Sequence, residues 1–139
     1  LGLIPTLKRY VDAFKEQTEN QVDLSISGLE RRLESYIEVI IFRSIQELMG
    51  FAHRQGPATQ IKINVTLGDK NIKVIIEDNG KGFDVEELFR GSGISIKAIK
   101  DRVEMLGGVM DVESTPDRGG YFTFQIPIGG TNQAVFTEL

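Results

Sequence analysis

Apolar and polar residues alternate along several stretches of the chain, and this period of two predicts β-strands with one buried face. The alternation covers residues 21–27, 61–65, 72–76 and 122–128, and Met110 with Val112 indicates a further short strand. The Gly68-Asp69 turn separates the second and third stretches, which therefore predict a hairpin. A turn at residues 115–117 precedes the last strand.

Apolar residues recur at helical spacing along three other stretches, which predicts three amphipathic helices. The stretches cover roughly residues 1–18, 33–54 and 96–106. Pro5 suits the first turn of the first helix. Gly56-Pro57 and Gly107-Gly108 follow the second and third stretches, and such residues end helices.

The order of these elements predicts an α+β fold, a two-layer α/β sandwich in which helices cover one face of a mixed sheet. Residues 79–95 carry glycines among acidic and polar residues, which favours a mobile loop over a packed element. We name residues 79–95 the lid loop. We expect one domain over residues 1–139, in which residues 130–139 form a polar tail.

The composition is ordinary for a soluble globular domain, with 40% hydrophobic and 26% charged residues. The net charge of -4 argues against a nucleic-acid partner, and the lack of cysteine excludes disulfides and thiolate metal sites. The sequence has no apolar run of membrane-spanning length and no signal peptide, so we expect a cytoplasmic location without membrane contact. Because Leu1 is not a methionine, we expect a piece of a longer protein.

Residues 78–83 have the features of the floor of a nucleotide pocket. Asp78 is in phase with the apolar side chains of the preceding strand, and a carboxylate carried inward requires hydrogen-bond donors. A purine amino group is one such donor. Gly80 and Gly82 lack a Cβ atom, so a flat ring can come close to the backbone. The alternative is a plain Asn-Gly turn between two strands.

Glu47, Phe51 and Arg54 share one face of the second predicted helix, because they are spaced by one turn each. A carboxylate at this place can orient or deprotonate an attacking group, and a guanidinium can neutralise phosphate oxygens. The alternative is a solvated helix face that carries ordinary surface charges.

Four stretches together resemble the asparagine box and the three glycine boxes of the GHKL ATPases. They are Gln46-Glu47-Leu48-Met49, Asp78-Asn79-Gly80-Lys81-Gly82-Phe83, Gly91-Ser92-Gly93-Ile94 and Arg118-Gly119-Gly120. Within that family the chain is most similar to the catalytic ATP-binding domain of sensor histidine kinases of the nitrate-sensor and desaturase-sensor type. Residues 1–7 are similar to the junction with that subfamily's dimerisation helices, and residues 101–108 and 113–116 to its stretch after the lid.

This resemblance implies the Bergerat ATPase fold and ATP as the ligand. Asp78 would accept the adenine amino hydrogen, and Gly80 and Gly82 would shape the adenine slot. The other implied ligand-binding positions are Arg54, Gly91, Gly93, Ser95, Gly119 and Gly120.

The second glycine box has two possible registers. In the first, Gly91 and Gly93 let the lid backbone approach the phosphates, and the helix start near Ser95 adds its positive end. Counting back from Arg102 gives the second, in which Gly93 and Ser95 occupy the two glycine positions.

The resemblance implies an enzyme, a protein histidine kinase of a two-component system. Glu47 is the candidate catalytic base. The phosphoacceptor histidine would lie on the dimerisation domain of the same protein, and a response regulator would receive the phosphoryl group next. His53 lacks a following acidic residue, and we interpret it as a packing or helix-surface residue.

Three departures from the family pattern concern the metal, the phosphates and the adenine. Phe51 stands where the family has its metal-binding asparagine, and a phenyl ring offers no oxygen to Mg²⁺. The usual Lys-His pair reads Arg54-Gln55, and Gly120 replaces a threonine. We therefore assign no metal ligand and place the dependence on Mg²⁺ in doubt.

Two alternatives follow from the same residues. The first is a degenerate, non-catalytic nucleotide-binding module, which Phe51 favours. The second is an anti-sigma-factor serine kinase of the same fold, which would be a free-standing protein.

Overall fold

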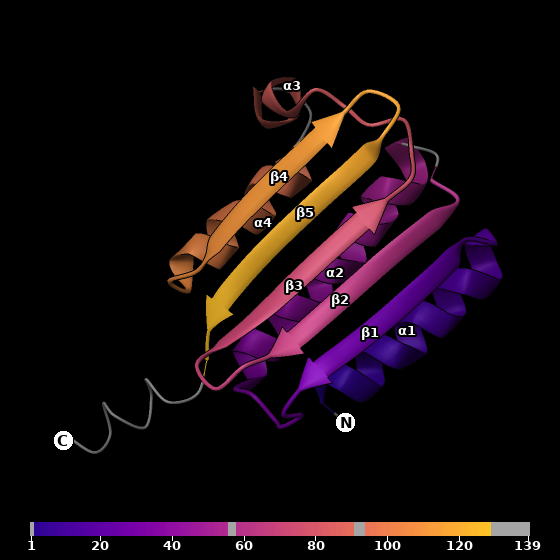
Figure 1. Ribbon diagram of the computed structural model, residues 1–139. Helices are drawn as coiled ribbons and strands as arrows, with labels where there is room; N and C mark the ends of the chain where they lie inside the picture. The colour runs from indigo at the N-terminus through magenta and orange to yellow at the C-terminus, as the bar shows by residue number, and fades with distance from the viewer. Residues whose placement is uncertain (1, 56–57, 91–93, 129–139) are drawn as a thin grey trace, which may run out of the picture.

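The computed structural model describes residues 2–55, 58–90 and 94–128, which form a five-stranded sheet and four helices (Figure 1). The helices are α1 (Leu3–Thr18), α2 (Ser35–Gln55), α3 (Val85–Arg90) and α4 (Ile94–Met105). The strands are β1 (Gln21–Gly28), β2 (Gln60–Leu67), β3 (Asn71–Asp78), β4 (Val109–Thr115) and β5 (Gly119–Pro127). The elements that the sequence predicts are all present near their expected positions.

The strands lie in the order β1-β2-β3-β5-β4. β1 and β2 are parallel, because α2 carries the chain back between them, and every other neighbouring pair is antiparallel. The predicted hairpin of β2 and β3 is confirmed, and it closes where the Gly68 N–H donates to the Asn71 carbonyl at 2.8 Å. β3 is the central strand, so its carboxyl end lies between β2 and β5.

The helices α1, α2 and α4 cover one face of the sheet, as Figure 1 shows. The core lies between the two layers, and its fully buried members from the sheet include Ile61, Ile72, Ile76, Phe122 and Ile126. From the helices the core includes Leu7, Ile41, Ile45, Leu48, Ile96 and Ile99. The predicted two-layer architecture with a mixed sheet is therefore confirmed.

The short helix α3 corrects the prediction for the lid loop, because residues 85–90 are helical. Asp84 caps this helix, since its Oδ1 accepts hydrogen bonds from the N–H groups of Glu86 at 2.9 Å and Glu87 at 3.2 Å. Leu88 and Phe89 are half-buried and pack against the core. Six residues are too few to show a helical period, so the composition of the segment dominated the prediction.

Asn20 joins the end of α1 to the end of α2 and the start of β2. In the orientation that satisfies its amide, Nδ2 donates to the carbonyls of Ala58 at 2.7 Å and Thr59 at 3.3 Å. The Oδ1 atom accepts hydrogen bonds from Thr18 Oγ1 and His53 Nδ1, each at 3.1 Å. The ring of His53 also packs edge-on against Phe14. His53 is therefore a packing residue, as the sequence indicated.

We expect Asn20→Ala to lower the free energy of unfolding by about 1–3 kcal/mol, because buried partners would lose their hydrogen bonds. Urea denaturation measures the loss. Asn71→Ala is the matched control on the exposed start of β3, and we expect a change within about 0.5 kcal/mol. Equal losses in the two variants would contradict the role of Asn20 as a buried link.

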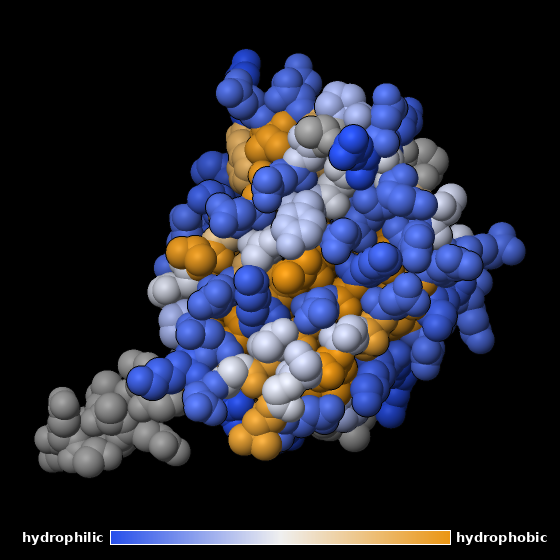
Figure 2. Space-filling model, in the orientation of Figure 1, coloured by the Kyte–Doolittle hydropathy of each residue, from blue (hydrophilic) through white to orange (hydrophobic). Residues whose placement is uncertain are grey.

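The other face of the sheet is not covered by the described helices, and Figure 2 shows polar side chains with apolar ones between them. The exposed apolar side chains there include Val109 of β4 and Tyr121 of β5. Among residues 2–55, 58–90 and 94–128, no helix has the length and apolar content that a membrane crossing requires.

Candidate functional site

Asp78 is the last residue of β3, and its carboxylate is half-buried. The N–H of Gly80 donates to Asp78 Oδ1 at 2.8 Å, and the N–H of Gly120 also donates to this carboxylate. Burial raises the pKa of the Asp78 carboxyl above its ordinary value, and the hydrogen bonds from Gly80 and Gly120 offset only part of that rise. These hydrogen bonds therefore fix the direction of the carboxylate, but they offset only part of the cost of its burial.

The loop after Asp78 is anchored to two strands. Asn79 Oδ1 accepts hydrogen bonds from the N–H groups of Thr59 and Gln60, both at 2.9 Å, at the start of β2. The N–H of Phe83 donates to Ser114 Oγ of β4 at 2.9 Å. β3 pairs with β2 and β5, and the chain after it leads into α3, so the alternative of a plain hairpin turn is wrong.

Two glycines of this region are required by the backbone. Gly119 has φ +84°, and a Cβ atom there would lie 2.0 Å from the Asp78 carbonyl oxygen. Gly82 has φ 81°, in the left-handed region that other residues rarely adopt. At Gly120 a Cβ atom would lie 2.9 Å from Asp78 Oδ2 and 3.0 Å from the Phe83 ring. Gly119 and Gly120 therefore let β5 approach the Asp78 carboxylate.

Three phenyl rings connect this region to α2, and we name Phe51, Phe83 and Phe122 the phenyl cluster. The ring centroids of Phe51 and Phe83 are 5.3 Å apart, and those of Phe51 and Phe122 are 5.9 Å apart, both edge to face. Phe83 and Phe122 stack at 5.8 Å. Phe51 is only 7% exposed, so its ring is packed inside the fold.

Glu47 lies one turn before Phe51 on α2 and faces α4. Its Oε1 atom lies 3.7 Å from Arg102 Nη2, and each side chain is 34% exposed. Its Oε2 atom is buried and accepts no hydrogen bond from the described residues. Arg54 is exposed, and its guanidinium lies back along α2 beside Gly50. A Cβ atom on Gly50 would lie 2.9 Å from Arg54 Nη1. Glu47 therefore pairs with a neighbouring helix, whereas the exposed Arg54 fits the alternative of a solvated helix face.

Three of the expected ligand positions are beyond what the structure describes. Gly91 and Gly93 lie outside the described residues, so both registers of the second glycine box stay open. The backbone of Ser95 belongs to the first turn of α4, which begins at Ile94, and its side chain is not described. The prediction of a helix start near Ser95 is confirmed.

A cavity of about 270 Å³ lies beside Asp78. It is lined by Glu77, Asp78, Glu113, Ser114, Arg118, Gly119, Gly120 and Tyr121. Glu77 and Glu113 both pair in register with Tyr121, so two carboxylates border the cavity on the uncovered face of the sheet. Their negative charge disfavours phosphate oxygens beside them, although the cavity lining also includes the cation Arg118.

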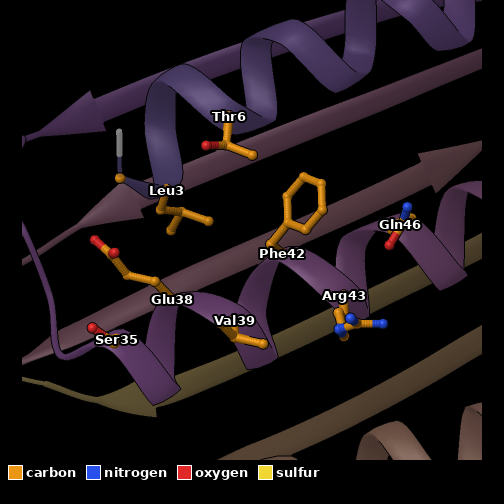
Figure 3. A pocket seen from close by; sticks show the side chains of 9 residues that line it. Leu3, Thr6, Ser35, Glu38, Val39, Phe42, Arg43 and Gln46 are labelled. Carbon is orange, nitrogen blue, oxygen red and sulfur yellow. The ribbon is translucent and has the colours of Figure 1, made fainter.

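A larger groove of about 500 Å³ lies between α1 and α2, away from Asp78 (Figure 3). It is lined by Gly2, Leu3, Thr6, Ser35, Glu38, Val39, Phe42, Arg43 and Gln46. The side chain of Phe42 extends from α2 toward α1, as Figure 3 shows. Leu3, Val39 and Phe42 give the groove an apolar part, and Arg43 gives it a cation.

Glu38 lines this groove, and its carboxylate connects the first turn of α2 to the segment before the helix. Arg32 donates to it through Nε at 3.2 Å and Nη2 at 3.1 Å, and the N–H of Leu33 donates at 3.0 Å. Burial by itself would raise the pKa of Glu38, but the hydrogen bonds from Leu33 and Arg32 outweigh it and lower the pKa. The carboxylate is thus satisfied within the fold.

The sequence predicts Asp78 and Glu47 as site residues. It does not predict that Ser114 and Phe83 hold the loop after Asp78, or that Arg102 pairs with Glu47. Ser114 and Arg102 lie in stretches that carry the family resemblance, which was a signal of their importance. Their contacts join distant parts of the chain and leave no local pattern.

Residues 36–130 match the family of histidine kinase-, DNA gyrase B- and HSP90-like ATPases. The chain belongs to this family of ATP-binding domains, which confirms the resemblance of its four boxes. The match spans α2 through the end of β5 and thus includes Glu47, Asp78 and the phenyl cluster.

The curated relatives include sensor kinases. The chain is 36% identical over 128 residues to the signal transduction histidine-protein kinase/phosphatase DegS of Brevibacillus brevis, covering 92% of this chain and 33% of that protein. It is 24% identical over 128 residues to the oxygen sensor histidine kinase NreB of Staphylococcus carnosus, covering 92% of this chain and 37% of that protein. The chain therefore spans about a third of the length of these relatives.

Solved structures share the fold. The ATP-binding domain of PrrB from Mycobacterium tuberculosis matches with a TM-score of 0.70 at 18% identity, covering 94% of this chain and 96% of that chain. The histidine kinase domain of a blue-light activated kinase from Erythrobacter litoralis matches with a TM-score of 0.72 at 14% identity, covering 92% and 66%. These likenesses confirm the expected Bergerat-type architecture.

Proposed function

We propose that this chain is the ATP-binding catalytic domain of a sensor histidine kinase. In the whole protein it would bind ATP and transfer the γ-phosphoryl group to a histidine on a dimerisation helix, from which a response regulator receives it. The observation that carries the proposal is the half-buried Asp78 carboxylate, held by two backbone N–H groups at the end of the central strand of an ATPase-family domain.

The adenine would be recognised by Asp78. Its carboxylate accepts hydrogen bonds only, so it suits an amino group and rejects a carbonyl oxygen at the same place. Gly80, Gly82, Gly119 and Gly120 would leave room for the flat ring, and the anchored loop keeps the acceptor in position. The supporting observation is that Asp78 is half-buried and that its two backbone hydrogen bonds offset only part of the cost of burial. A hydrogen bond from a bound amino group would offset more of that cost.

The phosphates would lie between α2 and the start of α4. Arg54 supplies a guanidinium, and the first turn of α4 near Ser95 supplies N–H groups and the positive end of the helix. Gly91 and Gly93 would let the preceding backbone approach. Glu47 would accept the proton of the imidazole whose other nitrogen bonds to the γ-phosphorus, as the bond to ADP breaks and its electron pair stays on ADP.

The residues present do not fit a metal site of the family's kind. Phe51 occupies the position of the metal-binding asparagine, is 7% exposed and packs against two other rings. Mg²⁺ requires oxygen ligands in near-octahedral geometry, and a buried phenyl ring supplies none. We therefore propose that nucleotide binding by this chain depends only weakly on Mg²⁺.

We expect the affinity for a non-hydrolysable ATP analogue to change by less than about tenfold across a Mg²⁺ titration, which is about 1.4 kcal/mol. Phe51→Asn should increase this dependence, because an amide oxygen there is one turn from Glu47 and Arg54. Calorimetry measures both proteins under conditions in which circular dichroism finds them folded.

Phe51→Leu is the matched control, because leucine keeps an apolar side chain without adding an oxygen. It should leave the Mg²⁺ dependence as weak as in the wild type. Strong dependence in the wild type, or no gain in Phe51→Asn, would contradict the placement of position 51 at the metal.

The dimerisation domain would join this chain at residues 1–7. The groove between α1 and α2 opens at this junction, since Leu3 and Thr6 line it together with Phe42. Its apolar part would accept an apolar side chain of the neighbouring domain, and Arg43 would face an acidic one.

The phosphotransfer assay tests the function. The full-length protein is incubated with ATP labelled at the γ-phosphorus, and we expect a phosphohistidine that is labile in acid and stable in base. Glu47→Gln should reduce labelling. Nucleotide binding without labelling would instead favour the degenerate module that Phe51 suggests. The relatives DegS and NreB are histidine kinases, which favours the catalytic function over both alternatives.

A further inference from the structure

The structure assigns to Arg102 the role of a positioning residue for Glu47. Arg102 holds one oxygen of the Glu47 carboxylate and leaves the other directed to the reacting group. This role rests on the proposed function, in which Glu47 is the base.

The two oxygens of Glu47 have different surroundings. Oε1 lies 3.7 Å from Arg102 Nη2, which is an ion pair longer than a hydrogen bond. Oε2 is buried and accepts no hydrogen bond from any described residue. A buried oxygen without a donor is destabilising, so its retention needs a reason. An acceptor that takes up a proton during the reaction is such a reason.

Arg102 differs from the other basic residues of α4. Lys97 pairs with Asp101 at 3.7 Å and Lys100 pairs with Glu104 at 2.8 Å, both within the helix at i, i+4. Arg102 lies in the last turn of α4 and its ion pair crosses to α2. Because the pair is partly buried, with each side chain 34% exposed, water screens it less than it screens a fully exposed pair.

The pair links the helix that starts beside the second glycine box to the helix that carries the base. A carboxylate on a long side chain samples several rotamers, and a guanidinium on one side restricts them. At 3.7 Å the contact is an ion pair that limits the positions of the Glu47 carboxylate. Arg102 thereby acts on the rate through the direction of Glu47 Oε2.

The test compares phosphorylation rates of the full-length protein and its variants at saturating ATP. We expect Arg102→Met to lower the rate roughly ten- to hundredfold, because a small misplacement of a catalytic group has effects of that size. Its affinity for an ATP analogue should stay within about twofold of the wild type, because a residue that positions the base acts on the rate and not on binding. Arg102→Lys should recover part of the rate because it keeps the charge.

A double-mutant cycle tests whether Arg102 acts on the rate through Glu47. In the Glu47→Gln background, Arg102→Met should cause no further loss, because the two residues act as one unit. Lys97→Met is the matched control, which removes a cation from α4 without touching the pair, and it should keep the wild-type rate.

Three results would overturn the assignment: a lower ATP affinity in Arg102→Met, a further loss in the Glu47→Gln background, or an equal loss in Lys97→Met. If the wild-type protein transfers no phosphoryl group, the proposed function fails and this role fails with it. An active wild type with an equally active Arg102→Met variant overturns only the role of Arg102.

Discussion

Replacement of Asp78 by alanine is expected to weaken adenine-nucleotide binding roughly ten- to hundredfold, since a hydrogen bond to a charged group contributes about 1.5–3 kcal/mol. The carboxylate is half-buried and held by the N–H groups of Gly80 and Gly120, so water cannot easily replace it as the acceptor. Isothermal titration calorimetry with an ATP analogue measures the loss. Equal affinities of wild type and variant would exclude Asp78 as the adenine reader.

Two comparisons make this experiment specific. Asp111→Ala removes an exposed carboxylate of β4 and should leave the affinity unchanged. Asp78→Asn keeps the shape but adds a donor, so it should reduce the preference for ATP over GTP, whose base carries an oxygen in place of the amino group. An unchanged preference in Asp78→Asn would indicate that another group reads the base.

The pH dependence of binding has a defined direction. Burial raises the folded pKa of Asp78 above its unfolded value, so the neutral form stabilises the fold at low pH and this contribution is lost as pH rises through the folded pKa. The ionised form is the better acceptor for the amino group. The affinity for ATP should therefore fall as pH drops through the folded pKa of Asp78, and this decrease should be absent in Asp78→Ala.

Phe51→Ala is expected to lower the free energy of unfolding by about 3–5 kcal/mol. Phe51 is 7% exposed and makes edge-to-face contacts with Phe83 and Phe122, each worth about 0.5–1.5 kcal/mol beyond the buried area. Alanine would leave a cavity between α2, the loop after β3 and strand β5. Urea denaturation of wild type and variant measures the difference.

The matched control is Tyr36→Ala on the same helix, where the ring is 51% exposed, and we expect a change near 0.5 kcal/mol or less. Phe51→Leu should cost less than about 1.5 kcal/mol, because it keeps most of the apolar volume. A loss below about 1 kcal/mol in Phe51→Ala would mean that the phenyl cluster contributes little to the fold.

Local patterns along the chain were enough to predict the elements and their buried faces. Ile72, Val74 and Ile76 lie two residues apart on β3, and all three are fully buried. The same period carried Asp78 to the inner side, which is why its place in the site was predictable. Such patterns are local, because the direction of a side chain follows from the secondary structure alone. The family boxes located Glu47 and the glycines in the same way.

The helix α3 shows where local reasoning ended. Its cap Asp84 and its apolar Leu88 and Phe89 are present in the sequence, but glycines and acidic residues around them favoured a loop. Helices this short gain most of their stability from packing, and the contact of Leu88 and Phe89 with the core exists only in the folded chain.

Which distant residues meet depends on how the helices and strands pack together. The strand order β1-β2-β3-β5-β4 places β5 beside β3 and so brings Gly120 to Asp78. The packing of α2 against α4 pairs Glu47 with Arg102, and the closing of the core joins the three rings of the phenyl cluster. These contacts depend on how whole elements pack, and packing selects among many partners of similar chemistry that no local pattern distinguishes.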